Sequence, residues 1–325
     1  LLLCLLLAVD LAHALPAREW RKVLDLGGQW KFMIGDNPEW KAPGADDFLW
    51  DYIQVPGSWE DQGFNGYDGF AWYRKSFKLP QNAGRNLYLH LGYIDDVDEV
   101  YINGHLAGFS GSLPPAYYTA FHAYRRYRIP LEYLNANGEN VIAVRVYDHQ
   151  IEGGIVHGEA GIFTPAGDLT ALDLQGVWKF RHGDHPDWKN PALDDAGWEN
   201  MMVPAAWENQ GYRHYDGFAW YRLSFLVPAS LNAEYYLLLL GRIDDFDQTW
   251  LNGQLIGVTN DRQPFGRSFS YRQPRVYSVP AALLKKGEIN TVAIRVQDVG
   301  HVGGLYEGPV ALVSRRQYFS DMRNR

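Results

Sequence analysis

The acidic residues are the first place in this sequence where residue type and spacing could support chemistry. Glu60 and Asp68 flank an aromatic segment, and an equivalent pair occurs at Glu208 and Asp216. Hydrolysis of a glycosidic bond needs two carboxyl groups ~5 to 9.5 Å apart across the bond that is cleaved. These two pairs are therefore the best candidates for hydrolytic chemistry.

Both acids also have structural interpretations, which we favour. Asp68-Gly69 is a turn signal, and Glu60 could form an ion pair with Arg74 or Arg145. The sequence has no complete nucleophile elbow and no His-Glu-x-x-His. We therefore assign no catalytic residue. If the chain is enzymatic, we expect it to act on O-glycosyl compounds.

Two groups of three aspartates are spaced closely enough to hold a cation. Clustered carboxylates repel one another unless a cation or backbone donors compensate, and Ca²⁺ prefers oxygen ligands of this kind. The alternative is that these acids cap turns or meet arginines. We expect no required cofactor, and a structural Ca²⁺ is the one ion we consider. The candidate ligands are Asp95, Asp96 and Asp98, with Asp244, Asp245 and Asp247 as their counterparts.

Aromatic and polar residues that could bind a sugar occur at matching places in both halves. A flat ring can cover the apolar face of a pyranose, while Asp, Arg or His can form hydrogen bonds to hydroxyl groups. The alternative is that the tryptophans are packing aromatics and the arginines are internal partners. The candidate ligand-binding residues are Trp59, Tyr67, Asp68, Trp72, Arg74, Arg145, His157, Trp207, Tyr215, Asp216, Trp220, Arg222, Arg295 and Glu307.

An internal repeat organises the positions of all these residues. Trp30 and Trp178 begin equivalent Trp-Lys-Phe motifs 148 residues apart, and Tyr67 to Arg74 recurs unchanged at the same offset. The offset grows to 150 by Val144, which indicates small loop insertions. The segments after Gly108 and Gly257 differ between the copies, so binding is favoured in these divergent loops.

Comparing the two copies also predicts strand faces, because a core face must stay apolar in both. Tyr73 and Phe77 return as Tyr221 and Phe225, whereas the alternate positions carry a conserved Trp-x-Arg. Asn-Gly follows a strand-like segment in each copy and is a strong hairpin signal. Short alternating strands separated by turns indicate an all-β fold, with a jelly-roll sandwich in each half.

Composition narrows the class of partner. The 325 residues are enough for two domains, and the 15% aromatic content fits short strands better than long helices. A net charge of −8 provides no basic field for phosphate backbones. Nucleic acid is therefore excluded as an expected partner.

The first residues have the features of an export signal. An apolar run over residues 1–9 is too short to cross a bilayer stably, and Ala12-His13-Ala14 fits a small-x-small cleavage site. We predict a signal peptide cleaved after Ala14 and a secreted or periplasmic protein; a buried N-terminal strand is the alternative. Cys4 lies in this segment, so the mature protein has no thiol for disulfides, catalysis or metal binding.

The order of the motifs resembles the sugar-binding, galactose-binding-like jelly-roll domain of glycoside hydrolase family two, in tandem. The motifs in the first copy are Asp46-Asp47-x-x-Trp50, Val55-Pro56, Trp59-Glu60, Ala71-Trp72-Tyr73-Arg74, Ile102-Asn103-Gly104 and Gly153-Gly154-Ile155, and the same order occurs in the second. Similar modules accompany bacterial β-galactosidases, β-glucuronidases and sialate O-acetylesterases. No stretch remains for the (β/α)₈ catalytic barrel, which needs ~250 residues.

The resemblance implies an exported carbohydrate-binding or accessory protein without its own catalytic barrel. Its expected partner is an oligosaccharide or polysaccharide, with a catalytic chain as a further partner and no stable membrane span. The alternatives are a fragment or subunit of a glycoside hydrolase or sialate O-acetylesterase, and a structural or protein-interaction module. The predicted organisation is a signal peptide (1–14), a first sandwich (15–163), a linker (164–171), a second sandwich (172–314) and a C-terminal tail (315–325).

Overall fold

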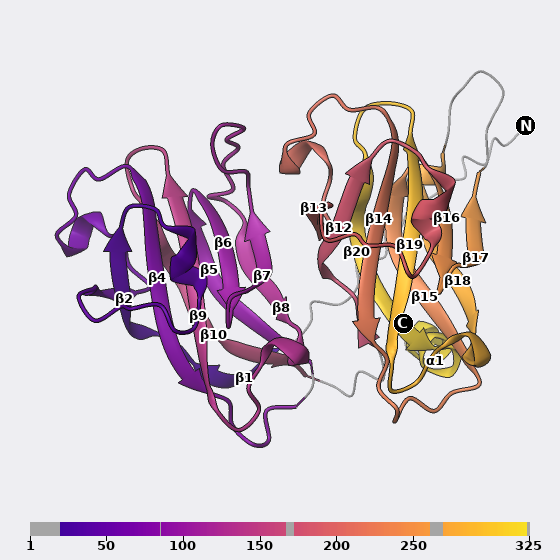
Figure 1. Cartoon of the computed structure of the whole chain (residues 1–325), viewed down its shortest axis with the longest axis horizontal. Helices are drawn as coiled ribbons and strands as arrows, with labels where there is room; N and C mark the ends of the chain where they lie inside the picture. The colour runs from indigo at the N-terminus through magenta and orange to yellow at the C-terminus, as the bar shows by residue number, and fades with distance from the viewer. Residues whose placement is uncertain (1–19, 85, 167–171, 261–268, 324–325) are drawn as a thin grey trace, which may run out of the picture.

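The computed structural model of the chain describes residues 20–84, 86–166, 172–260 and 269–323 and contains two β-sandwiches (Figure 1). The predicted signal peptide lies outside these residues. The strands of the first module are β1 (Trp20–Asp25), β2 (Gly28–Ile34), β3 (Asp51–Val55), β4 (Gly69–Lys78), β5 (Leu87–Asp95), β6 (Val97–Ile102), β7 (His105–Ser110), β8 (Tyr124–Ile129), β9 (Glu139–Asp148) and β10 (Gly154–Pro165).

The second module repeats these ten strands and adds one helix. Its strands are β11 (Leu172–Asp173), β12 (Gly176–His182), β13 (Glu199–Val203), β14 (Gly217–Leu226), β15 (Tyr235–Asp244), β16 (Phe246–Leu251), β17 (Gln254–Thr259), β18 (Pro274–Pro280), β19 (Ile289–Asp298) and β20 (Gly304–Ser314). Helix α1 (Arg315–Arg323) occupies the segment predicted as a tail. None of the described helices has the length and apolar character that crossing a membrane requires.

Each module is built from a six-stranded and a four-stranded sheet with antiparallel pairing throughout. The strand orders are β3-β2-β4-β9-β6-β7 and β1-β10-β5-β8 in the first module. In the second module every strand is replaced by the one numbered ten higher. This correspondence confirms the repeat and the predicted class, an all-β chain with two tandem jelly-roll sandwiches.

The core of each sandwich contains the faces that the repeat identified. Tyr73 is fully buried and Phe77 is nearly so, and Val144 and Val146 pack into the same cluster from β9. Their counterparts on β14 and β19 form the core of the second module. Side chains two residues apart on a strand share a face, so the alternation in sequence translates directly into this packing.

The opposite face of β4 is buried as well, so Trp72 and Arg74 match the packing alternative to sugar binding. Trp72 and Arg74 project away from the sandwich core, but the 3₁₀ turn η1 (Pro38–Lys41) and the loop after it fold over them. Trp72 is fully buried beside Trp50, and Arg74 is only 3% exposed. The second module has the same arrangement under η4 (Pro186–Lys189). Each module therefore has a small second core outside its sandwich.

The predicted Asn-Gly turns are confirmed, and their backbone explains the residue choice. Asn103 and Gly104 have φ angles of 49° and 84°, and Asn252 and Gly253 have 51° and 82°. Positive φ is accessible to these two residue types at low cost. The Asn103 side chain also accepts a hydrogen bond from the Val141 amide at 2.9 Å, which ties the β6–β7 turn to β9.

The two modules contact each other through particular side chains. The Tyr88 hydroxyl of the first module donates a hydrogen bond to Asp173 of the second. The Arg213 guanidinium lies 4.8 Å from the ring centre of Tyr118, and Met202 packs against the first module's core cluster. Besides the β5–β11 contact of Tyr88 with Asp173, the surface between the modules is made by β7, β8 and the loop joining them on one side, and by β12, β13 and the segment after β13 on the other (Figure 1).

Candidate functional site

The tryptophans of the Trp-Glu motifs lie inside the modules. Trp59 is fully buried, and its Nε1 donates a hydrogen bond to the Tyr67 carbonyl at 3.2 Å. Trp207 is equally buried, and its Nε1 contacts the Tyr221 hydroxyl at 2.5 Å. These rings have no exposed face for a sugar to cover, so they support the fold in this conformation.

The Trp-x-Arg residues are held in the second core of each module. The Arg74 Nε donates to Asp47 at 2.9 Å, and its Nη1 reaches the Trp40 carbonyl at 2.5 Å. Trp72 donates to Asp36 at 3.1 Å. The equivalent Trp220 and Arg222 have acidic partners at Asp184 and Asp195. Internal partners therefore occupy the polar groups of all four side chains.

Two further pairs of candidates are half-buried and bonded within their own module. Arg145 donates to both oxygens of Asp36 and to Glu99, and Arg295 similarly holds Asp184. The hydroxyl groups of Tyr67 and Tyr215 each bridge two backbone groups near the start of the long central strand.

The remaining sugar-binding candidates are exposed. Asp68 and Asp216 lie at the turns that precede β4 and β14, and His157 lies on β10. Glu307 accepts an ion pair from the Arg242 Nη1 at 2.6 Å. The structure does not bring these exposed residues together with the buried tryptophans into one binding surface.

The glutamates of the candidate carboxylate pairs support a turn. Glu60 accepts a hydrogen bond from the Gly153 amide at 3.0 Å, and both oxygens of Glu208 lie 3.3 Å from the Gly303 amide. The Gly-Gly turn packs directly on Trp59, because a Cβ at Gly153 would lie 2.1 Å from the tryptophan ring. The repeat of this contact in both modules explains these glutamates as structural residues.

The aspartate clusters differ from the prediction by one member in each module. The carboxylates that gather are Asp95, Asp96 and Asp148 in the first module, with Asp244, Asp245 and Asp298 in the second, and one oxygen from each lies within 4.8 Å of the others. We call these the acidic triads. They could bind a metal ion. Asp98 and Asp247, the predicted third ligands, lie outside these triads and form ion pairs with Arg125 and Arg275.

Strand pairing explains why Asp148 joins the triad. Val97 is paired with Tyr147 on β9, and the Asp96 amide donates to the Tyr147 carbonyl at 3.2 Å. The end of β9 therefore lies beside the junction of β5 and β6, where Asp95 and Asp96 are found. The same register recurs between β16 and β19 in the second module.

Burial and mutual repulsion perturb the carboxylates of the triads. Burial, followed by the hydrogen bond and charge of Asp96, raises the pKa of Asp95 to about 7. Burial and the Asp245 charge raise the pKa of Asp244 to about 8. Burial of Asp96 would also raise its pKa, but hydrogen bonds from Thr119 and Tyr117 outweigh this and hold the pKa below its usual range. Ionising all three carboxyl groups of a triad therefore costs free energy, because the groups are buried and repel one another.

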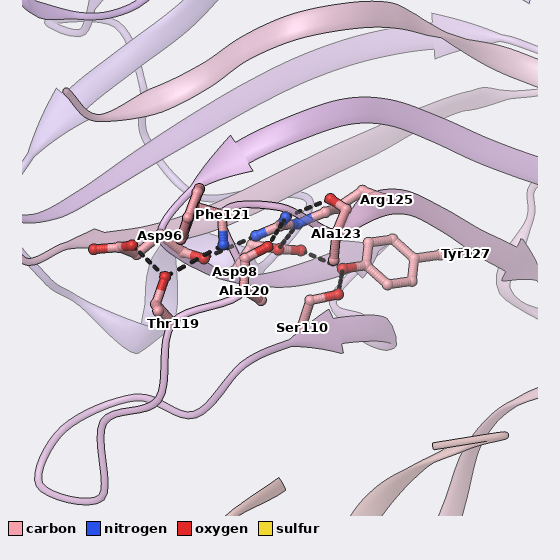
Figure 2. A network of polar contacts seen from close by, with 9 residues as sticks. All are labelled: Asp96, Asp98, Ser110, Thr119, Ala120, Phe121, Ala123, Arg125 and Tyr127. Carbon is pink, nitrogen blue, oxygen red and sulfur yellow. Dashed lines mark hydrogen bonds and ion pairs between the residues drawn. The ribbon is translucent and has the colours of Figure 1, made fainter. Parts of the chain in front are cut away.

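Asp98 belongs to a separate buried network, which Figure 2 shows. The Arg125 Nε donates to Asp98 at 2.7 Å, and the Tyr127 hydroxyl donates to the other carboxylate oxygen at 2.6 Å. Arg125 also donates to the carbonyls of Ala120 and Asp96. Arg125 and Asp98 are both completely buried.

The second module has the same network, which the sequence analysis missed. Arg275 donates to Asp247 at 2.9 Å, and the Tyr277 hydroxyl donates at 2.7 Å. A signal was present, because the Arg-x-Tyr of Arg125 and Tyr127 recurs 150 residues later. Its meaning depended on β8 of one sheet lying next to β6 of the other, which local periodicity does not reveal.

A cleft lies between the modules and takes in the divergent loop that the sequence analysis favoured for binding. Its volume is about 250 Å³. The first module contributes β7, β8 and the loop between them, including Tyr118, His122, Tyr124 and Arg126, and the second contributes residues near η5 (Glu208–Gln210), including Asn209. The corresponding loop of the second module, residues 261–268, lies outside the described residues.

Comparison with known proteins confirms the resemblance to accessory domains of family-two glycosidases. Residues 182–302 match the family described as "Beta-galactosidase second all-beta domain". A putative β-glucuronidase of Formosa agariphila is 30% identical over 154 residues, which are 43% of this chain and 14% of that protein. Beta-galactosidase BoGH2A of Bacteroides ovatus is 28% identical over 139 residues, which are 39% of this chain and 15% of that protein.

Solved structures of similar proteins are also larger than this chain. The structural alignment with a Bacteroides uniformis β-glucuronidase covers 90% of this chain and 28% of that enzyme's chain, with 16% identity and a TM-score of 0.40. The chain spans about one seventh of the length of the two curated relatives above. The family match and these two relatives make the chain similar to the accessory all-β region of such glycosidases.

Proposed function

We propose that this chain is an exported, non-catalytic carbohydrate-binding region, and that the cleft between its modules binds the sugar. The cleft carries the proposal, because it joins aromatic rings of the first module with polar side chains of both modules in one concave surface. Export rests on the apolar N-terminal run and the Ala12-His13-Ala14 cleavage pattern.

The lining of the cleft suits a single sugar residue at the end of a glycan. Tyr118 and Tyr124 supply aromatic surface, and His122, Arg126 and Asn209 supply hydrogen-bonding groups. A volume of about 250 Å³ is below the ~300 to 1,000 Å³ typical of sites for drug-sized ligands. A long oligosaccharide would therefore enter with one terminal residue and extend into solvent.

The relatives point to the sugars that should be tried first. They are named as β-glucuronidases and β-galactosidases, so a glucuronic acid or galactose residue is the proposed ligand. The guanidinium of Arg126 favours the acidic sugar on charge grounds. In this proposal the chemistry is carried out by a catalytic domain that the accessory region serves, on the same chain or on a partner.

A glycan array followed by isothermal titration calorimetry tests the proposal. We expect Tyr118→Ala to weaken binding at least ~10-fold, which corresponds to ~1.4 kcal/mol, because truncation removes an aromatic ring from the lining of the cleft. Tyr52→Ala is the matched control, since Tyr52 is 65% exposed and lies outside the cleft. Absence of binding to any glycan would reject the function, and unchanged affinity of Tyr118→Ala would reject the cleft as its site.

A further inference from the structure

The acidic triads contain a buried oxygen that the protein leaves without a hydrogen bond. Asp148 is fully buried, and its Oδ1 accepts from the Gln150 amide at 3.0 Å, but its Oδ2 has no partner. Asp298 is 2% exposed, its Oδ1 accepts from the Gly300 amide at 2.9 Å, and its Oδ2 has no partner. A buried acceptor without a partner costs free energy, and the same unpaired oxygen occurs once in each module.

The triads also have no basic side chain paired with them in the described part of the chain. Among the described residues, none of the six carboxylates forms an ion pair with Lys or Arg. The nearby guanidinium groups of Arg125 and Arg275 direct Nε to Asp98 and Asp247 instead. The side-chain donors to Asp96 are neutral, namely the Tyr117 and Thr119 hydroxyl groups. Three carboxylates gathered without a counter-charge repel one another.

We propose that each acidic triad binds one Ca²⁺ ion, with the unpaired oxygens of Asp148 and Asp298 as ligands. Ca²⁺ is held by oxygen atoms at ~2.3 to 2.6 Å, so two ligands of one ion lie at most ~5 Å apart. One carboxylate oxygen from each residue of a triad lies within 4.8 Å of the other two. Asp95 and Asp244 are partly exposed, which leaves room for water to complete the coordination.

In the first module the ion site is connected to the wall of the cleft. Asp96 holds Tyr117 at 2.6 Å and also Thr119, and Thr119 itself lines the cleft. An ion that fixes Asp96 therefore also orders the loop between β7 and β8. We expect Ca²⁺ to slow amide hydrogen exchange in this loop, a readout that does not depend on any sugar.

Calorimetric titration of CaCl₂ into the chelator-treated full chain tests the sites directly. We expect two ions per chain, and one after either Asp148→Asn or Asp298→Asn. Both changes keep the side-chain shape and remove a buried charge, so we expect the variants to fold without the ion, as circular dichroism would show. Asp51→Asn on the exposed edge strand β3 is the control and should keep both ions.

Thermal unfolding gives a second measure of the same binding. A ligand that binds only the folded state raises its melting temperature, so Ca²⁺ should stabilise the wild type and lose part of that effect in each triad variant. Extracellular modules bind Ca²⁺ with dissociation constants as weak as ~10⁻³ M. No heat and no stabilisation up to ~10 mM Ca²⁺ would overturn the proposal. Two ions retained in the Asp148→Asn variant would overturn the ligand set.

Discussion

The Asp98–Arg125 pair offers the sharpest test of what holds the first module together. Both side chains are completely buried, and Arg125 donates to Asp98 and to three backbone carbonyls. The Asp98→Asn change keeps the shape but removes the counter-charge. Breaking a buried ion pair through one partner costs ~3 to 5 kcal/mol, and Asn retains part of the hydrogen bonding. We therefore expect a loss of about 3 kcal/mol.

Urea unfolding, followed by tryptophan fluorescence, measures this loss. With a slope of ~3 kcal/mol per molar urea, the midpoint should fall by about 1 M. The tryptophans Trp59 and Trp207 are buried in different modules, so the signal reports on both. Asp247→Asn should produce a comparable loss, because its Arg275 partner is equally buried.

A double substitution separates the ion pair from mere disruption. Replacing both Asp98 by Leu and Arg125 by Met leaves no buried charge, and such exchanges are often neutral. The double variant should therefore be more stable than Asp98→Asn alone. A loss under ~0.5 kcal/mol for Asp98→Asn, the range of ordinary surface changes, would refute the reasoning. The reasoning would also be refuted if the double variant lost as much unfolding free energy as Asp98→Leu and Arg125→Met lose together when measured singly.

Two other predictions concern single residues of the first module. Burial, with Arg126 nearby, lowers the pKa of His90 to about 4, so the unfolded chain takes up a proton first as the pH falls from 6.5. His90→Leu, which copies Leu239 of the second module, should therefore gain about 3 kcal/mol relative to wild type between pH 7 and pH 4 in denaturant titrations; a constant difference would contradict this. Gly108→Ala places a Cβ 2.1 Å from the Tyr127 ring and should cost ~1 to 3 kcal/mol, measured by thermal unfolding, whereas Gly44→Ala, with open space around it, should cost little.

The sequence was most informative where structure depends on local alternation. The apolar positions Tyr73, Phe77 and Val144 were identifiable as core because both copies keep them apolar. The Asn103-Gly104 turn was identifiable because few residue pairs accept its positive φ angles. Both inferences need only neighbouring residues and the comparison of copies.

The parts that escaped prediction depend on contacts between distant segments. Trp72 and Arg74 alternate with the core, and packing aromatics and internal arginine partners were the alternative to sugar binding, but the sequence did not show that η1 and its loop cover them. Asp98 is two residues from Asp96, which suggested a shared site, but β8 brings Arg125 to Asp98 and β9 brings Asp148 to Asp96. Neither contact is encoded in a short stretch of sequence.

The contact between the modules makes the two copies unequal despite their shared fold. The first copy meets its neighbour mainly through β7 and β8, with Tyr88 of β5, whereas the second meets it mainly through β12 and β13, with Asp173 of β11. Met202 completes the first copy's packing, so cutting the chain at the junction would bare an apolar surface on one half. Exchanging the order of the modules would not rebuild this contact. The strands that form it in each module would then lie on the side that faces away from the neighbouring module. The two copies share one fold but use different strands for their mutual contact. Each module is therefore specific to its position in the chain.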